Sequence, residues 1–156
     1  MAKQDWHYLL FLLTSHHPKE RLHRTIRIGF KRKSVFLCSR CTGTFLGILT
    51  IFIAKAFALR IPVEFFLPLI SLLPLMATID WFTQSAKLRE STNWLRVCSG
   101  FLVGNAQALI LLLLLEGFFV KFFVALGIAS IYVISIYLIA YKTKCLESYL
   151  NDINQL

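Results

Sequence analysis

Four long stretches of the chain are apolar and almost free of charge, and short polar segments separate them. A helix that crosses the ~30 Å hydrocarbon core of a membrane needs about 20 mostly apolar residues. The stretches approach this length, because the first continues beyond Lys55, whose amine can extend to the lipid headgroups. The pattern therefore predicts four transmembrane helices, over residues 41–59, 65–79, 97–115 and 122–141.

The connections predict how these helices are joined. Residues 60–62 and 116–121 leave room only for tight turns between antiparallel neighbours, so two helical hairpins are expected. Residues 6–14 are apolar over too short a length to cross a membrane, and we expect an interfacial helix there. The fold class is an all-α integral membrane protein. Its expected parts are a cytoplasmic and interfacial segment (1–33), a four-helix transmembrane domain (34–142) and a cytoplasmic tail (143–156).

The two hairpins open on similar sequences. Residues 41–47 and 98–104 both read Cys, a small hydroxyl residue, Gly, any residue, Phe or Leu, an aliphatic residue and Gly. Both copies enter the membrane from the same side, which predicts a parallel pseudo-repeat. Glycines four positions apart let two backbones approach closely. We expect the first and third helices to pack through them, and the same faces are candidate surfaces for a second copy or another membrane protein.

Composition supports an integral membrane protein, and the distribution of charge predicts how its spans are oriented. Apolar residues make up 57% of the 156 residues, and 17 Lys and Arg against 8 Asp and Glu give a net charge of +9. Nine basic residues lie in residues 1–40, three in 81–96 and two after 141, against three on the other side. The positive-inside rule therefore predicts that both termini are cytoplasmic. The excess of basic residues also favours contact with anionic lipid headgroups. Nucleic-acid binding is not expected, because the basic residues do not alternate with aromatic residues in a nucleic-acid-binding fold.

Polar side chains gather at the predicted cytoplasmic ends of the spans. Ionisable groups at membrane depth are costly and tend to mark function. Asp80 and Gln84 share a face if their helix continues, and so do Asn93 and Arg96 at the start of the third span. In one interpretation Asp80 is a catalytic base, and Arg40, Gln84, Asn93 and Arg96 bind substrate. In the other, Asp80 is a structural ion-pair partner of Arg40 or Arg96.

A second group of residues has the chemistry of a metal site. Cys38 and Cys41 form a Cys-x-x-Cys, with His16, His17 and His23 upstream, and thiolates and imidazoles at such spacing can surround zinc. Apolar residues alternate with polar ones over 25–37, which predicts a short β-hairpin that presents the cysteines. Two alternatives remain open: a redox dithiol stabilised by Arg40, and cysteines that only pack.

The residues of both groups resemble a known family. The carrying residues are His16 ahead of Glu20-Arg21, the six-residue motif Cys38-Ser39-Arg40-Cys41-Thr42-Gly43, Asp80 with Gln84, and the run from Arg89 to Arg96 followed by Ser99-Gly100. They resemble the bacterial and archaeal family of small predicted membrane proteins named domain of unknown function 2085. The resemblance implies a location for the site, in a cytoplasmic membrane, and no reaction. Where the family has its first cysteine this chain has Ser15, which leaves His16, Cys38 and Cys41, with His17, His23 or water in the fourth position.

The leading hypothesis combines these features. A metal, expected to be zinc, is bound by His16, His17, Cys38 and Cys41 beside a polar pocket at the cytoplasmic face. If the protein is an enzyme, we expect hydrolysis or group transfer on a lipid or other anionic substrate, with Asp80 as base and an arginine on the anion. The alternatives are a membrane dithiol oxidoreductase and a non-enzymatic subunit of a membrane complex or transporter.

Overall fold

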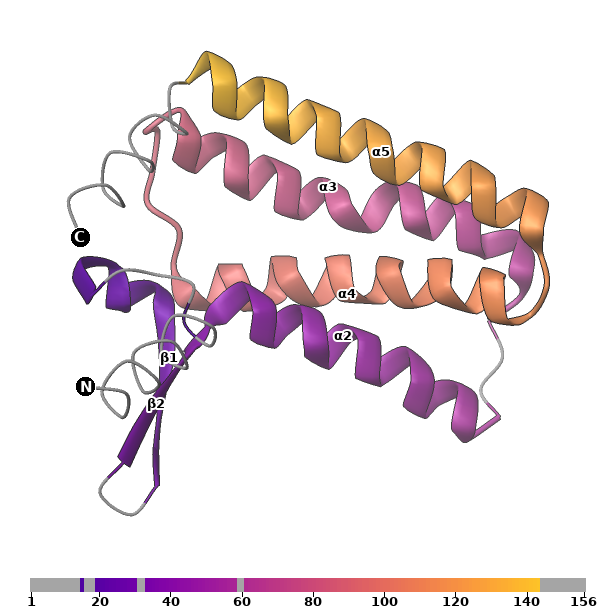
Figure 1. Cartoon of the computed structure of the whole chain (residues 1–156), viewed down its shortest axis with the longest axis horizontal. Coiled ribbons are helices and arrows are strands. Elements are labelled where there is room, and N and C mark those ends of the chain that lie inside the picture. Colours follow the sequence, from indigo (N-terminus) through magenta and orange to yellow (C-terminus); the bar gives the residue numbers. More distant parts are fainter. Residues whose placement is uncertain (1–14, 16–18, 31–32, 59–60, 144–156) are drawn as a thin grey trace, which may run out of the picture.

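The computed structural model of the protein describes residues 15, 19–30, 33–58 and 61–143. Figure 1 shows the long helices running side by side and a β-hairpin at one end of them. The predicted interfacial segment 6–14 lies outside the described residues. The elements are the 3₁₀ helix η1 (Lys19–Arg24), strands β1 (Thr25–Phe30) and β2 (Lys33–Cys38), helix α2 (Ser39–Ala56), the 3₁₀ helix η2 (Val63–Phe65), and helices α3 (Phe66–Ser85), α4 (Asn93–Leu115) and α5 (Phe119–Lys142).

Three of the described helices are long and apolar enough to cross a membrane, and they cover Val63–Ser85, Asn93–Leu115 and Phe119–Lys142. Helix α2, predicted as the first span, is not among them. It has 18 residues, begins with Ser39 and Arg40, and carries Lys55 in its last turn. These polar ends lower the mean hydropathy of α2 below that of the other three long helices.

The helices pack around α4. Helices α2 and α3 both lie against α4, and α5 packs on α3 and α4. The prediction made α2 and α3 direct neighbours in a hairpin, whereas α4 lies between them and they make at most slight contact. Half of the α4 span is buried, against 6% for α5. The apolar core lies among α3, α4 and α5 and consists of Phe66, Ile70, Leu109, Leu112, Leu113 and Ala125.

Backbone meets backbone where α2 crosses α4. A Cβ atom added to any of four glycines would lie far inside the contact distance of a carbonyl oxygen on the other helix. Each of these carbonyls belongs to the residue three positions before the opposing glycine, so the contact is reciprocal. The glycine pattern predicts this packing. The pairs of glycine and carbonyl are Gly43 with Val97, Gly47 with Phe101, Gly100 with Arg40 and Gly104 with Thr44.

The short β-hairpin predicted over residues 25–37 is confirmed. Strands β1 and β2 pair antiparallel, with a register from Thr25 opposite Cys38 to Phe30 opposite Lys33. Strand β2 leads directly into α2, so the hairpin sits where α2 and α4 begin and α3 ends (Figure 1). We call this end of the molecule the hairpin end.

The close contact at the glycines predicts that larger residues there lower the stability of the protein. Gly43→Ala and Gly104→Ala force a methyl group against a backbone carbonyl that cannot yield without separating the helices. We expect each to lower the free energy of unfolding in micelles by about 1–3 kcal/mol, the usual cost of overpacking. Gly127→Ala on α5 is the matched control, because nothing lies within 4 Å of a Cβ added there. Equal unfolding free energies for the three variants would contradict the close approach of α2 and α4.

Candidate functional site

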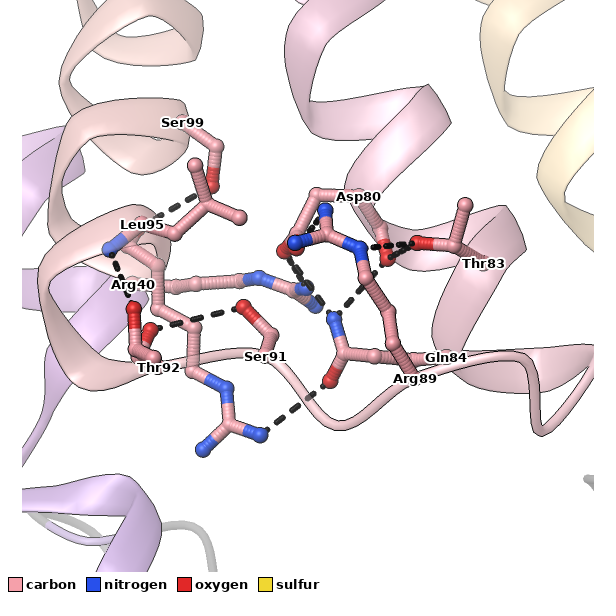
Figure 2. A network of polar contacts seen from close by, with 10 residues as sticks. Arg40, Asp80, Thr83, Gln84, Arg89, Ser91, Thr92, Leu95 and Ser99 are labelled. Carbon is pink, nitrogen blue, oxygen red and sulfur yellow. Dashed lines mark hydrogen bonds and ion pairs between the residues drawn. The ribbon is translucent and has the colours of Figure 1, made fainter.

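A buried carboxylate forms the centre of the hairpin end. Asp80 is 2% exposed, and both of its oxygens are engaged. Oδ2 accepts hydrogen bonds from Arg40 Nη2 (2.5 Å) and Gln84 Nε2 (3.0 Å), while Oδ1 faces Arg89 Nη2 at 3.3 Å. Figure 2 shows the two guanidinium groups at this carboxylate, Arg40 coming from α2 and Arg89 from the connection between α3 and α4. The charged hydrogen bonds thus join three segments of the chain.

Local structure explains how these side chains meet. Helix α3 continues beyond its predicted end at residue 79 to Ser85, so Gln84 stands one turn after Asp80, as the interpretation of a shared face requires. The helix then ends in a Schellman motif, with the amide of Leu88 bonded to the carbonyl of Thr83 and that of Lys87 to Gln84. Lys87 has a φ of 56°. This left-handed residue reverses the chain and returns Arg89 toward Asp80.

Arg96 is the most deeply buried cation of the site. It is 4% exposed, and its Nη2 donates to Gln84 Oε1 at 3.2 Å. Gln84 is therefore a neutral bridge, with its amide nitrogen on Asp80 and its carbonyl oxygen on Arg96. Arg96 Nη1 is buried and has no hydrogen-bond partner among the residues that the structure describes.

Side chains from α2 and α4 hold the start of β1 in place. Asn93 Nδ2 donates to the backbone oxygens of His23 (2.8 Å) and Thr25 (3.3 Å), and Ser39 Oγ donates to that of Arg24 (3.0 Å). The junction of η1 and β1 is thereby fixed against the first turns of both helices. As a consequence, the guanidinium of Arg24 lies beside the site.

The connection between α3 and α4 makes a further contact with this junction. Glu90 Oε1 lies 2.9 Å from His23 Nε2 and 3.5 Å from Arg24 Nη2. The hydrogen bond and charge of His23 lower the pKa of Glu90 below its usual value, with a smaller contribution from Arg24. Both His23 and Glu90 are exposed, so this pair ties down the surface of the site and adds little to stability.

Cations outnumber anions at the hairpin end. Arg96 lies within electrostatic range of Arg24 and Arg40, which oppose its charge, and of Asp80 and Glu90, which favour it. We call Arg24, Arg40, Arg89 and Arg96 the arginine cluster; it faces two described carboxylates. Within the described part of the chain three buried guanidinium nitrogens lack a partner: Arg24 Nε, Arg40 Nε and Arg96 Nη1.

The structure brings most of the predicted polar residues together. Arg40, Asp80, Gln84 and Arg96 form one network of hydrogen bonds, whereas the Asn93 amide donates to the backbone of β1 and η1. Their catalytic and substrate-binding roles stay predictions. Sequence reasoning did not select Arg24 or Arg89. Arg89 had a signal, its place in the run that ends at Arg96, while nothing distinguished Arg24 from the other basic residues near the N-terminus.

The predicted metal site falls partly outside the described residues, because His16 and His17 are not among them. Cys38 is buried, Cys41 is exposed and the two side chains interact with each other. His23, the alternative ligand, is hydrogen-bonded to Glu90. No group of three or more His, Cys, Asp or Glu suited to a metal ion occurs among the described residues. Zinc binding through the two cysteines and the upstream histidines stays a prediction.

Comparisons with known proteins agree with the membrane character of the chain. The family model described as "Predicted membrane protein (DUF2085)" matches residues 19–111, which contain the β-hairpin and the whole arginine cluster. An uncharacterized protein of Methanothermobacter thermautotrophicus is 42% identical over 77 residues, which make up 47% of this chain and 67% of that protein. No solved structure matches the chain.

The ion pairs of Asp80 predict a large effect of a small substitution. Asp80→Asn keeps the size of the side chain but leaves Arg40 and Arg89 without a countercharge. We expect the free energy of unfolding to fall by about 2–4 kcal/mol, less than for a fully buried pair because both arginines remain partly exposed. Glu116→Gln, which breaks the exposed pair of Glu116 with Lys55 (2.7 Å), is the control and is expected to cost about 0–1 kcal/mol. Similar losses in the two variants would contradict a structural role for Asp80.

The metal prediction is tested by elemental analysis of protein purified without chelator. If the cysteines and the upstream histidines bind zinc, about one equivalent per chain is expected, and Cys41→Ser is expected to reduce it. Cys98→Ser, outside the motif, is the control and keeps the metal. A wild-type content under roughly a tenth of an equivalent excludes the site. In that case a reversible Cys38–Cys41 disulfide, detected by thiol trapping in cells, would favour the oxidoreductase alternative.

Proposed function

The chain belongs to the DUF2085 family of predicted membrane proteins, and on that premise we propose that it crosses the membrane four times and binds an anionic group with its arginine cluster. Helix α2, the first long helix of the chain, is the span proposed in addition to α3, α4 and α5. Its 18 residues reach about 27 Å at 1.5 Å per residue, close to the thickness of the hydrocarbon core. It also lies against α4, a span by length and composition, and basic residues flank its start.

An even number of spans puts both ends of the chain on one side. The hairpin end carries most of the basic residues, so it is the cytoplasmic end by the positive-inside rule. The reciprocal glycine contacts of α2 and α4 support a parallel pseudo-repeat, since both helices start at this end and related residues touch. The arginine cluster is then at the boundary between cytoplasm and membrane.

The state of Arg96 is the observation that carries the binding proposal. A buried cation costs several kcal/mol unless an anion and hydrogen bonds compensate it. The only hydrogen-bond partner that the described residues offer its guanidinium is the neutral amide of Gln84. Arg24 and Arg40 are nearby cations that raise the cost further. An anion accepting from the unpartnered nitrogens of the cluster would remove this deficit.

Asp80 positions the arginines in this proposal. Its two oxygens hold Arg40 and Arg89 and leave Arg40 Nε unpaired, so the carboxylate orients cations without neutralising the cluster. The side chains of Arg24 and Arg40 are 29% and 30% exposed, so an anion can approach them from the water side. Guanidinium groups match the tetrahedral oxygens of phosphate, and such a group can come from a lipid headgroup or from a soluble phosphate compound.

The binding proposal predicts stabilisation by inorganic phosphate. In a neutral detergent, phosphate is expected to raise the unfolding temperature above that in chloride of equal ionic strength. At a concentration 100 times the Kd, linkage gives about 2.7 kcal/mol. Arg24→Gln and Arg96→Gln are expected to lose most of this effect. Arg27→Gln, an exposed arginine of β1 that no contact places in the cluster, is the control and keeps it.

The source of the phosphate group is separated by a second measurement. Native mass spectrometry after extraction from phosphatidylglycerol or phosphatidylcholine nanodiscs reports whether an anionic lipid is retained, and Arg24→Gln is expected to release it. Retained phosphatidylglycerol indicates a headgroup, and stabilisation by phosphate alone indicates a soluble ligand. Neither effect, or equal effects in wild-type and the cluster variants, would show that other groups of the chain neutralise the arginines.

A further inference from the structure

The two faces of the β-hairpin differ in polarity. In the register of β1 and β2, Ile26 lies opposite Leu37 and Ile28 opposite Val35. Because side chains alternate between faces along a strand, these four residues share one face. The other face carries Thr25 with Cys38, Arg27 with Phe36, and Gly29 with Ser34. The hairpin is therefore amphipathic over these residues, with two aliphatic pairs next to each other on one face.

The half of this aliphatic face that lies toward the turn is exposed, whereas Ile26 and Leu37 are half-buried. Ile28 is 50% and Val35 47% exposed. Among the described elements the strands pack mainly on each other, on η1 and on the start of α2, and Asn93 of α4 reaches only the base of β1 at Thr25. An isolated two-stranded hairpin is marginally stable in water and needs an apolar surface against which to pack.

Position in the molecule supplies such a surface. Figure 1 shows the hairpin running across the direction of the four helices, at the end where α2 and α4 begin. If the helices cross the membrane, an element perpendicular to them at their ends lies along the membrane plane. This is the depth at which lipid headgroups give way to acyl chains.

We propose that the hairpin is an interfacial anchor whose face of Ile26, Ile28, Val35 and Leu37 rests on the lipid of the cytoplasmic leaflet. Charge supports lipid as the occupant. The first 40 residues hold nine basic and two acidic residues. On the opposite face, Arg27 lies over the ring of Phe36 at 6.0 Å, where its charge can stay with water and headgroups. The anchor rests on the proposed spanning orientation but not on anion binding by the arginine cluster.

The test uses neighbouring residues that point to opposite faces. The photoreactive residue p-benzoylphenylalanine replaces Val35 or, as the matched control, Ser34, in the full chain reconstituted into phosphatidylglycerol-containing nanodiscs. After irradiation, mass spectrometry counts lipid adducts. We expect severalfold more lipid adduct at position 35 than at 34, and the same for 28 over 27. Both residues of each pair are exposed, so the substitutions are compatible with folding.

Position 133, an exposed residue in the middle of α5, reports on the membrane span itself. Lipid adducts at 133 and at 35 but not at 34 support the anchor. Adducts at 133 with none at 35 overturn the anchor while leaving the spanning orientation intact. Equal yields at 34 and 35, or adducts at 35 to another part of the polypeptide or to a second protein, also overturn it.

Discussion

The backbone contact between α2 and α4 is the constraint on which the site depends. In lipid no hydrophobic force drives helices together, so close packing of small residues must hold them. Gly100 lies under the carbonyl of Arg40, and this contact brings the first turn of α2 beside the α4 turn that carries Arg96. From there Arg40 reaches across to Asp80 on α3. A bulkier residue at position 100 would move Arg40 away from Asp80.

The close packing of α2 and α4 brings several arginines together. Anionic and neutral side chains lie between these arginines and separate their charges. Asp80 separates Arg40 from Arg89, and Gln84 separates the carboxylate from Arg96. The Gln84 amide donates on one side and accepts on the other, so it links an anion to a cation that the anion does not touch. The arrangement satisfies Asp80 fully and the arginines only in part, which is the imbalance expected of a site that receives an anion.

The sequence predicts the elements better than their arrangement. Hydropathy, the paired glycines and the alternation over residues 25–37 predict the helices, the α2–α4 contact and the hairpin, because each is a local pattern with a direct physical meaning. Insertion of α4 between α2 and α3 is not predictable from loop lengths, since a short loop limits distance and does not require packing. The site is likewise predictable only in part. Helical spacing places Asp80 and Gln84 on one face, but the approach of Arg89 depends on the left-handed conformation of Lys87, which no sequence motif predicts.

Hydrogen bonds link the position of the β-hairpin to that of the arginine cluster. Asn93 and Ser39 donate hydrogen bonds to the backbone of residues 23–25. This segment begins β1 and also carries the side chain of Arg24. A tilt of the hairpin relative to the helices must therefore move the Arg24 guanidinium or break these hydrogen bonds. If the aliphatic face rests on lipid, the membrane surface sets that tilt, and with it the position of Arg24, one of the three arginines that have a buried nitrogen without a described partner. The depth of the bilayer boundary and the geometry of the anion site are then coupled through a single short segment, residues 23–25.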